Sequence, residues 1–183
     1  MTTHPSVTAH WRRLDRAGTD RCTLSRLDNG WMLVGHAAWD EGALDYCVRC
    51  GPEWATLSGD VTGTYRDAQI GLSIQRTPGG WSVNGTPQPE AEDHTDLDLG
   101  FTPATNLLPL RRLPRSLTAP VTAPAAWLVP EMTHLKTLSQ IYSGTGSTVT
   151  YAAPSVGYAA DLTVHPSGFV THYPGLWEGW VDD

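Results

Sequence analysis

Short alternating runs, bounded by turn-forming residues, occupy most of this chain and limit what it can fold into. Asp28-Asn29-Gly30 separates two such runs, and Asn84-Gly85, a strong hairpin signal, lies inside another. No long stretch shows the spacing of an amphipathic helix. We therefore expect an all-β fold: a single domain over residues 1–183, with one antiparallel sheet curled into a spiral roll or unclosed barrel. The expected strands cover residues 21–27, 31–39, 43–50, 53–65, 68–77, 81–89, 95–101, 121–129, 134–142, 147–153, 158–164 and 168–174.

The net charge and the apolar content of the chain limit its binding partners and its location. The chain has 183 residues and a net charge of −7, and an acidic surface is a poor match for the phosphates of nucleic acids. No apolar run reaches membrane-spanning length, and the amino-terminal residues lack the apolar core of a signal peptide. The three cysteines are too few and odd in number for a disulfide framework. We expect a cytoplasmic protein with no transmembrane segment and no nucleic-acid partner.

Residues 96–113, DLDLGFTPATNLLPLRRL, combine acids, an amide and a double arginine in one stretch. Asp96 and Asp98 alternate with leucines, so a short strand would place both acids on one face, where they repel unless a partner offsets their charge.

A short helix is expected after this strand. Thr102-Pro103 is typical of a helix start, with threonine as the cap and proline in the first turn. The residue before a proline resists helical geometry, so Pro109 limits the helix to one or two turns. We expect residues 108–113 to be extended again.

Three polar side chains in this stretch have two interpretations. Arg111 and Arg112 can bind a carboxylate or a polar ligand group, and Asn106 offers both a donor and an acceptor. They could contact a ligand together with the two aspartates. Alternatively, they form a structural network in which the arginines tie neighbouring elements to the aspartates.

The remaining motifs with chemical potential are weaker. Cys47 and Cys50 form a CxxC motif, but they fall within an expected strand, which would direct the two thiols to opposite faces. His165 and His172 lie in adjacent expected strands without a metal-binding spacing. We therefore predict no metal site and no cofactor, and assign no catalytic residue.

Aromatic residues cluster near the carboxyl end, in GFVTHYPGLWEGW. Rings with polar tips suit sugars and lipid head groups, and they also suit a cluster that caps one end of a barrel. On the first interpretation, Tyr173 and Trp177 are candidate ligand-binding residues.

The stretch DLDLGFTPATNLLPLRRL, with AAWLVPEMTHLKTLSQIY, YAADLTV and GFVTHYPGLW, resembles a bacterial family described as putative glycolipid-binding proteins, formerly a domain of unknown function. The resemblance runs from about Trp31 to Trp177. It implies a spiral roll or unclosed barrel, similar in shape to periplasmic lipoprotein carriers and mycobacterial lipid-binding lipoproteins, and it implies glycolipid binding. The residues that match the family string are Asp96, Asp98, Gly100, Phe101, Pro103, Thr105, Asn106, Pro109, Arg111 and Arg112.

Three hypotheses follow, in order of preference. The first is a binding protein that holds an amphiphile, a lipid or glycolipid, on the concave side of the sheet. The second is a purely structural role for the polar cluster, with the function elsewhere in the chain. The third is a hydrolase-like enzyme acting on a sugar or lipid head group, with Asp96 or Asp98 as general base and Arg111 or Arg112 stabilising negative charge. The candidate ligand-binding residues are Asp96, Asp98, Asn106, Arg111, Arg112, Tyr173 and Trp177.

Overall fold

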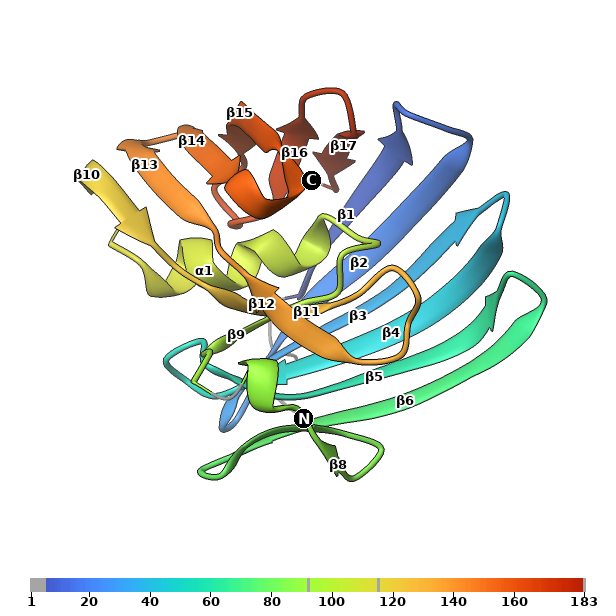
Figure 1. The fold of residues 1–183 in the computed structure, drawn as a ribbon. Coiled ribbons are helices and arrows are strands. Elements are labelled where there is room, and N and C mark those ends of the chain that lie inside the picture. Colours follow the sequence, from blue (N-terminus) through green and yellow to red (C-terminus); the bar gives the residue numbers. More distant parts are fainter. Residues whose placement is uncertain (1–5, 92, 115, 183) are drawn as a thin grey trace.

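The fold consists of two sheets, in which nearly all neighbouring strands are antiparallel, and one short α-helix (Figure 1). The computed structural model describes residues 6–91, 93–114 and 116–182. The larger sheet has 14 strands and the smaller has three. The expected all-β class with short helical turns is thus confirmed, although the strands form two sheets and not one. Within the described ranges, no helix is long and apolar enough to cross a membrane.

The bounds of the elements are as follows. The large sheet contains β1 (Ser6–Arg13), β2 (Gly18–Leu27), β3 (Gly30–Trp39), β4 (Gly42–Cys50), β5 (Thr56–Tyr65), β6 (Ala68–Thr77), β7 (Gly80–Val83), β8 (Thr86–Pro87), β10 (Ser116–Thr122), β13 (Ile141–Thr145), β14 (Thr148–Ala153), β15 (Tyr158–Val164), β16 (Val170–Tyr173) and β17 (Trp177–Val181). The small sheet contains β9 (Asp96–Asp98), β11 (Ala125–Leu128) and β12 (Leu135–Leu138). The helical segments are η1 (Pro89–Ala91), η2 (Ala104–Asn106), α1 (Leu107–Arg112) and η3 (Pro154–Val156).

Two meanders, β1–β8 and β13–β17, build the large sheet, and the pairing of β1 with β17 joins them. Neither β1 nor β17 was among the expected strands. The strand order is open, with β10 at one edge and β8 at the other, and no ladder joins these edges in the described part of the chain. The expected roll or unclosed barrel stays a prediction about how the sheet curves.

The turn-forming residues of the sequence lie in hairpin turns of the structure. Asp28 and Asn29 connect β2 to β3, and Asn84 and Gly85 connect β7 to β8. Asn84 and Gly85 have φ values of 48° and 79°, the left-handed conformation that a two-residue hairpin turn of this type requires.

Two of the expected strands change sheet partway along. Residues 121–129 divide between β10 and β11, and residues 134–142 divide between β12 and β13. Pro124 lies at the first break, where its missing N–H cannot contribute to a ladder. The small sheet arises from these breaks, because β11 and β12 leave the large sheet to pair with each other and β11 pairs in parallel with β9.

The central segment, residues 96–113, lies in the interior. In Figure 1, α1 and the small sheet sit between the strands β13–β16 and the strands β2–β5. Leu97 packs toward β5, since a Cβ atom at Gly59 would lie 2.5 Å from Leu97 Cδ2. Leu107 and Leu108 are fully buried, so the segment supplies side chains to the hydrophobic core.

The expectation that residues 108–113 are extended is wrong. The structure has the helix α1 over Leu107–Arg112. Pro109 is the third residue of this helix, in the turn whose N–H groups have no partner within the helix, so its missing N–H is tolerated there. Burial of Leu108 offsets the steric cost of helical geometry before a proline.

Candidate functional site

Asp96 and Arg112 form a partly buried ion pair between β9 and α1. Arg112 donates from Nη2 to Asp96 Oδ2 at 2.5 Å and from Nε to Asp96 Oδ1 at 3.2 Å. Asp96 is only 1% exposed, and the hydrogen bond from Arg112 to this carboxylate raises the pKa of the guanidinium. Because both carboxylate oxygens are engaged, the pair joins two elements and leaves Asp96 poorly placed for a ligand.

Asp98, on the same strand, has a different environment. Its Oδ1 accepts the Gly100 N–H at 2.7 Å and its Oδ2 accepts from Gln140 Nε2 at 2.7 Å. Burial raises the pKa of Asp98 to about 6, which leaves the carboxyl group mostly ionised at neutral pH. Gly100 has a φ of 69°, and a Cβ atom there would lie 2.7 Å from Trp127 Nε1. This turn therefore needs glycine.

Gln140 connects Asp98 to a chain of polar groups. Besides Asp98, Gln140 Nε2 donates to the Tyr151 hydroxyl at 3.1 Å, while its Oε1 accepts from the Tyr142 hydroxyl at 3.4 Å. Asn106 Nδ2 donates to the same Tyr142 hydroxyl at 3.3 Å. The predicted residues Asp98 and Asn106 are thus joined through side chains of β13 and the residue preceding it.

Four tyrosines surround this network. The ring centroids of Tyr142 and Tyr151 are 5.1 Å apart, and those of Tyr158 and Tyr173 are also 5.1 Å apart. Tyr151 bridges the pairs, at 6.1 Å from Tyr158 and 5.7 Å from Tyr173. Burial raises the pKa of Tyr151 and of Tyr158 to about 12, so their hydroxyl groups stay protonated at neutral pH. The Tyr158 hydroxyl donates its proton to the Pro174 carbonyl at 2.7 Å.

A cavity of about 290 Å³ opens beside these groups, and we call it the tyrosine pocket. Its volume is close to the lower end of small-molecule sites, which measure roughly 300–1,000 Å³. Its walls combine aromatic rings, a carboxylate and aliphatic side chains. The lining residues are Asp98, Gly100, Thr102, Pro103, Asn106, Trp127, Leu138, Tyr151, Ala153, Val156, Tyr158, Tyr173, Leu176 and Trp177.

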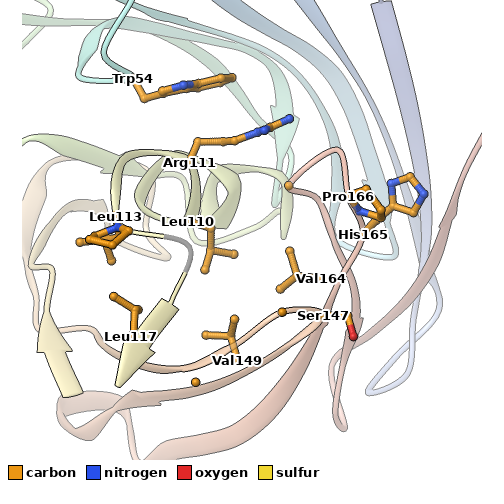
Figure 2. A pocket seen from close by; sticks show the side chains of 14 residues that line it. Trp54, Leu110, Arg111, Leu113, Leu117, Ser147, Val149, Val164, His165 and Pro166 are labelled. Carbon is orange, nitrogen blue, oxygen red and sulfur yellow. The ribbon is translucent and has the colours of Figure 1, made fainter. Parts of the chain in front are cut away.

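A second cavity of about 480 Å³ lies beside the carboxyl end of α1, and we call it the Arg111 cavity (Figure 2). In Figure 2, Trp54 and Arg111 lie on one side and Leu117 and Val149 on the other. Its other lining residues are Leu110, Leu113, Pro114, Gly144, Gly146, Ser147, Val164, His165, Pro166 and Gly168. Among the residues that the structure describes, none lines both this cavity and the tyrosine pocket.

The seven predicted site residues therefore separate into three groups. Four of them, Asp98, Asn106, Tyr173 and Trp177, line the tyrosine pocket. Arg111 lines the other cavity, and Asp96 and Arg112 form the partly buried ion pair. An enzyme with both aspartates beside open space is not assembled here, because only Asp98 of the two lines either cavity.

Sequence reasoning missed Tyr151, Tyr158, Trp127 and Gln140 as members of the site. The sequence does carry one signal for two of them, since Tyr158 begins an alternating run and Tyr151 follows Val149 with the same spacing. The pairing of β14 with β15 then aligns Tyr151 with Ala160, and this register cannot be read from local pattern.

A further buried carboxylate anchors the central segment to the large sheet. The Tyr46 hydroxyl donates to Asp20 Oδ1 at 3.0 Å, and the Thr102 hydroxyl also donates to the Asp20 carboxylate. Thr102 in turn accepts the Ala104 N–H at 3.0 Å, at the start of η2. Burial raises the pKa of Asp20 to about 6. This cluster stabilises the approach to the helix.

The two cysteines of the CxxC motif lie on opposite faces of β4, since Cys50 is buried on the inner face and Cys47 is half-buried on the outer one. Their separation across the sheet agrees with the expectation for a strand. Among the described residues, no three acids, histidines or cysteines are grouped so that they could hold a metal ion.

Comparisons with known proteins place the chain in a family. The match to the family described as "Putative glycolipid-binding" covers residues 8–179. The structure is similar to the crystal structure of a DUF1089-family protein from Pseudomonas aeruginosa, with a TM-score of 0.68 and 21% sequence identity, over 95% of this chain and 92% of that one. At this identity the likeness shows the fold alone. A search of curated proteins finds no match. Because the family match spans nearly the whole chain, this protein belongs to the family described as putative glycolipid-binding.

Proposed function

We propose that this protein binds an amphiphile with a hydroxyl-rich head group, such as a glycolipid, and that the tyrosine pocket holds the head group. The observation that carries the proposal is the arrangement of Tyr151, Tyr158 and Tyr173 around a cavity that Asp98 also lines. The family description, which names glycolipids, agrees with this chemistry.

The polar groups of the pocket suit sugar hydroxyls. A carboxylate accepts about four hydrogen bonds, and the structure gives Asp98 one from Gly100 and one from Gln140. The remaining acceptor capacity of Asp98 is available to a hydroxyl group. Tyrosine rings supply flat apolar surface for the C–H face of a sugar ring. The Tyr151 hydroxyl accepts from Gln140 Nε2 and supplies a donor, whereas the Tyr158 hydroxyl donates to the Pro174 carbonyl at 2.7 Å.

The rest of the lining suits the start of an alkyl chain. Leu138, Ala153 and Leu176 add aliphatic surface to the same pocket. Val156, on η3, lines the pocket and is 50% exposed, so a bound chain would cover apolar surface there. The pocket therefore offers both of the surfaces that an amphiphile needs.

A titration with two detergents of equal chain length tests the proposal. Octyl glucoside has a sugar head group, and octyl tetraethylene glycol has none. We expect the sugar compound to bind about tenfold more tightly, as one to two well-placed hydrogen bonds imply. The measurement is calorimetric titration below the critical micelle concentration of each detergent. Equal affinity for the two compounds would show that the protein does not recognise the sugar head group, and would contradict the proposal.

Matched variants locate the binding. Tyr158→Ala removes a ring from the tyrosine pocket, and Trp180→Ala removes a ring that is 57% exposed and does not line the pocket. Because Tyr158→Ala removes the contact between this ring and the ligand, it should lower the affinity for octyl glucoside by about tenfold. Trp180→Ala should leave the affinity unchanged. An equal effect of both variants, or no effect of Tyr158→Ala, would contradict the assignment of the pocket.

A further inference from the structure

The Arg111 cavity has features of a binding site that the proposed function does not use. It is the larger of the two cavities, at about 480 Å³, well within the range of small-molecule sites. Five aliphatic side chains line it, from α1 and the strands β10, β14 and β15 and the segment between α1 and β10. They are Leu110, Leu113, Leu117, Val149 and Val164. This surface suits a hydrocarbon chain.

A guanidinium group lies at one side of this apolar surface (Figure 2). Arg111 Nη2 donates to the Ser167 carbonyl at 2.5 Å, and its Cζ lies 5.4 Å from the ring centroid of Trp54. Trp54 stacks on Trp31 with a centroid distance of 4.4 Å. The carbonyl and the ring fix the orientation of the charged group, which reduces the entropy that it would lose when a ligand binds.

The charges around the cavity favour an anion. The chain as a whole has a net charge of −7, yet none of the described residues that line this cavity is an aspartate or a glutamate. Arginine, by contrast, lines it, and Ser147 and His165 add polar groups nearby. A guanidinium binds carboxylate and phosphate oxygens with particularly favourable geometry.

We infer that the Arg111 cavity binds a single acyl or alkyl chain with an anionic end, a carboxylate or a phosphate ester. The anionic group contacts the Arg111 guanidinium, and the chain lies against Leu110, Leu117 and Val149. This inference goes beyond the proposed function, because it concerns a separate cavity that shares none of its described lining residues with the tyrosine pocket.

Three probes with the same chain test the charge requirement: dodecanoate, dodecyl phosphate and dodecanol. Calorimetric titration of the purified protein should show the two anions binding at least about tenfold more tightly than the neutral alcohol, because a charge-assisted hydrogen bond adds that much. The tighter of the two anions identifies the kind of head group. Equal affinity for all three probes, or no binding of any, would overturn the inference.

Chain length tests whether the ligand fills a closed space. From octanoate to dodecanoate, the affinity should rise about fourfold for each added methylene while the chain is buried, and it should level off when the cavity is full. A rise that continues without a plateau would indicate adsorption to an open surface and contradict a site in this cavity.

Two variants, each with a matched control, locate the site. Arg111→Gln should abolish the preference for dodecanoate over dodecanol, whereas Arg49→Gln, which removes an exposed arginine from β4, should keep it. Leu117→Trp should fill the cavity and block both probes, whereas Leu57→Trp, at a position 47% exposed, should not. Dodecanol binding to Arg111→Gln serves as the check that its cavity is intact.

The two proposals can be tested independently of each other. Leu117→Trp should leave octyl glucoside binding unchanged, and Tyr158→Ala should leave dodecanoate binding unchanged. If Leu117→Trp leaves dodecanoate binding intact, or if Arg111→Gln keeps its preference for the anion, the Arg111 cavity is not the site.

Discussion

Asp96 and Asp98 are two residues apart on one short strand, but their surroundings give them different roles. Asp96 has both oxygens engaged by Arg112. Asp98 accepts from the Gln140 amide and the Gly100 N–H, and it lines a cavity. The structural interpretation thus fits Asp96, which belongs to an ion pair, whereas ligand contact stays a prediction, and it concerns Asp98, which lines a cavity.

Four of the seven predicted residues line one pocket, and the chemistry of their side chains is what identified them in the sequence. Polar residues within an apolar stretch marked Asp98 and Asn106, and aromatic residues behind a turn marked Tyr173 and Trp177. Gln140 carries no such signal, since a single glutamine after a strand is common. Its importance depends on the contacts it makes with Asp98 and Tyr151, which come from distant parts of the chain.

The raised pKa of Asp98 predicts a pH-dependent contribution to stability. The folded pKa is about 6 and the unfolded value is about 3.9, so the folded protein binds the proton more tightly. The contribution is fully present below about pH 4 and is lost as the pH rises through 6. Asp98→Asn lacks this titration. Its deficit in the free energy of unfolding relative to the natural protein should be about 2 kcal/mol larger at pH 4.5 than at pH 7.5.

Urea unfolding of both proteins at the two pH values measures this difference. Comparing the variant with the natural protein at each pH cancels the titration of the other groups, including Asp20, whose pKa burial also raises to about 6. A deficit of equal size at both pH values would show that Asp98 titrates alike in the folded and unfolded chains.

At the scale of elements, the local sequence pattern predicts the turns and alternating strands, which depend on residues adjacent in the sequence. The turn at Asn84-Gly85 and the alternation of Tyr158, Ala160 and Leu162 both appear in the structure. The prediction of extended structure over residues 108–113 is wrong because Pro109 lies in the first turn of α1, where a proline is tolerated. The choice of sheet by β11 and β12 depends on long-range pairing and has no local signal beyond Pro124.

The packing of β9 against β5 can be tested with two glycines in strands. A Cβ atom at Gly59 would lie 2.5 Å from Leu97 Cδ2, whereas a Cβ atom at Gly71, on β6, meets nothing within 4 Å. Leu97 is buried and has little room to move, so Gly59→Ala should lower the free energy of unfolding by about 1–3 kcal/mol. Gly71→Ala should be neutral or raise it by up to about 1 kcal/mol, because alanine reduces the entropy of the unfolded chain. Urea denaturation of both variants gives the comparison, and similar values would mean that β9 does not pack closely on β5.

At the scale of the whole molecule, one segment connects the two meanders of the large sheet. Residues 96–113 contact β2 and β4 through Thr102, β5 through Leu97 and β13 through Asn106. The two cavities lie beside this segment, one lined by Asp98 and Asn106 and the other by Arg111. The pairing of β1 with β17, which joins the meanders, brings together residues about as far apart in sequence as this chain allows, and local pattern did not predict it.

The most direct test of the central claim is native mass spectrometry of the protein after incubation with a total lipid extract, followed by extraction and fragmentation of whatever remains bound. If the tyrosine pocket holds a sugar head group, the natural protein and Trp180→Ala should carry the same added mass, which fragments into a sugar and an alkyl or acyl chain, and Tyr158→Ala should lose most of it. The absence of any sugar-bearing lipid among the bound molecules, or equal loading of Tyr158→Ala with the sugar-bearing lipid, would contradict the account.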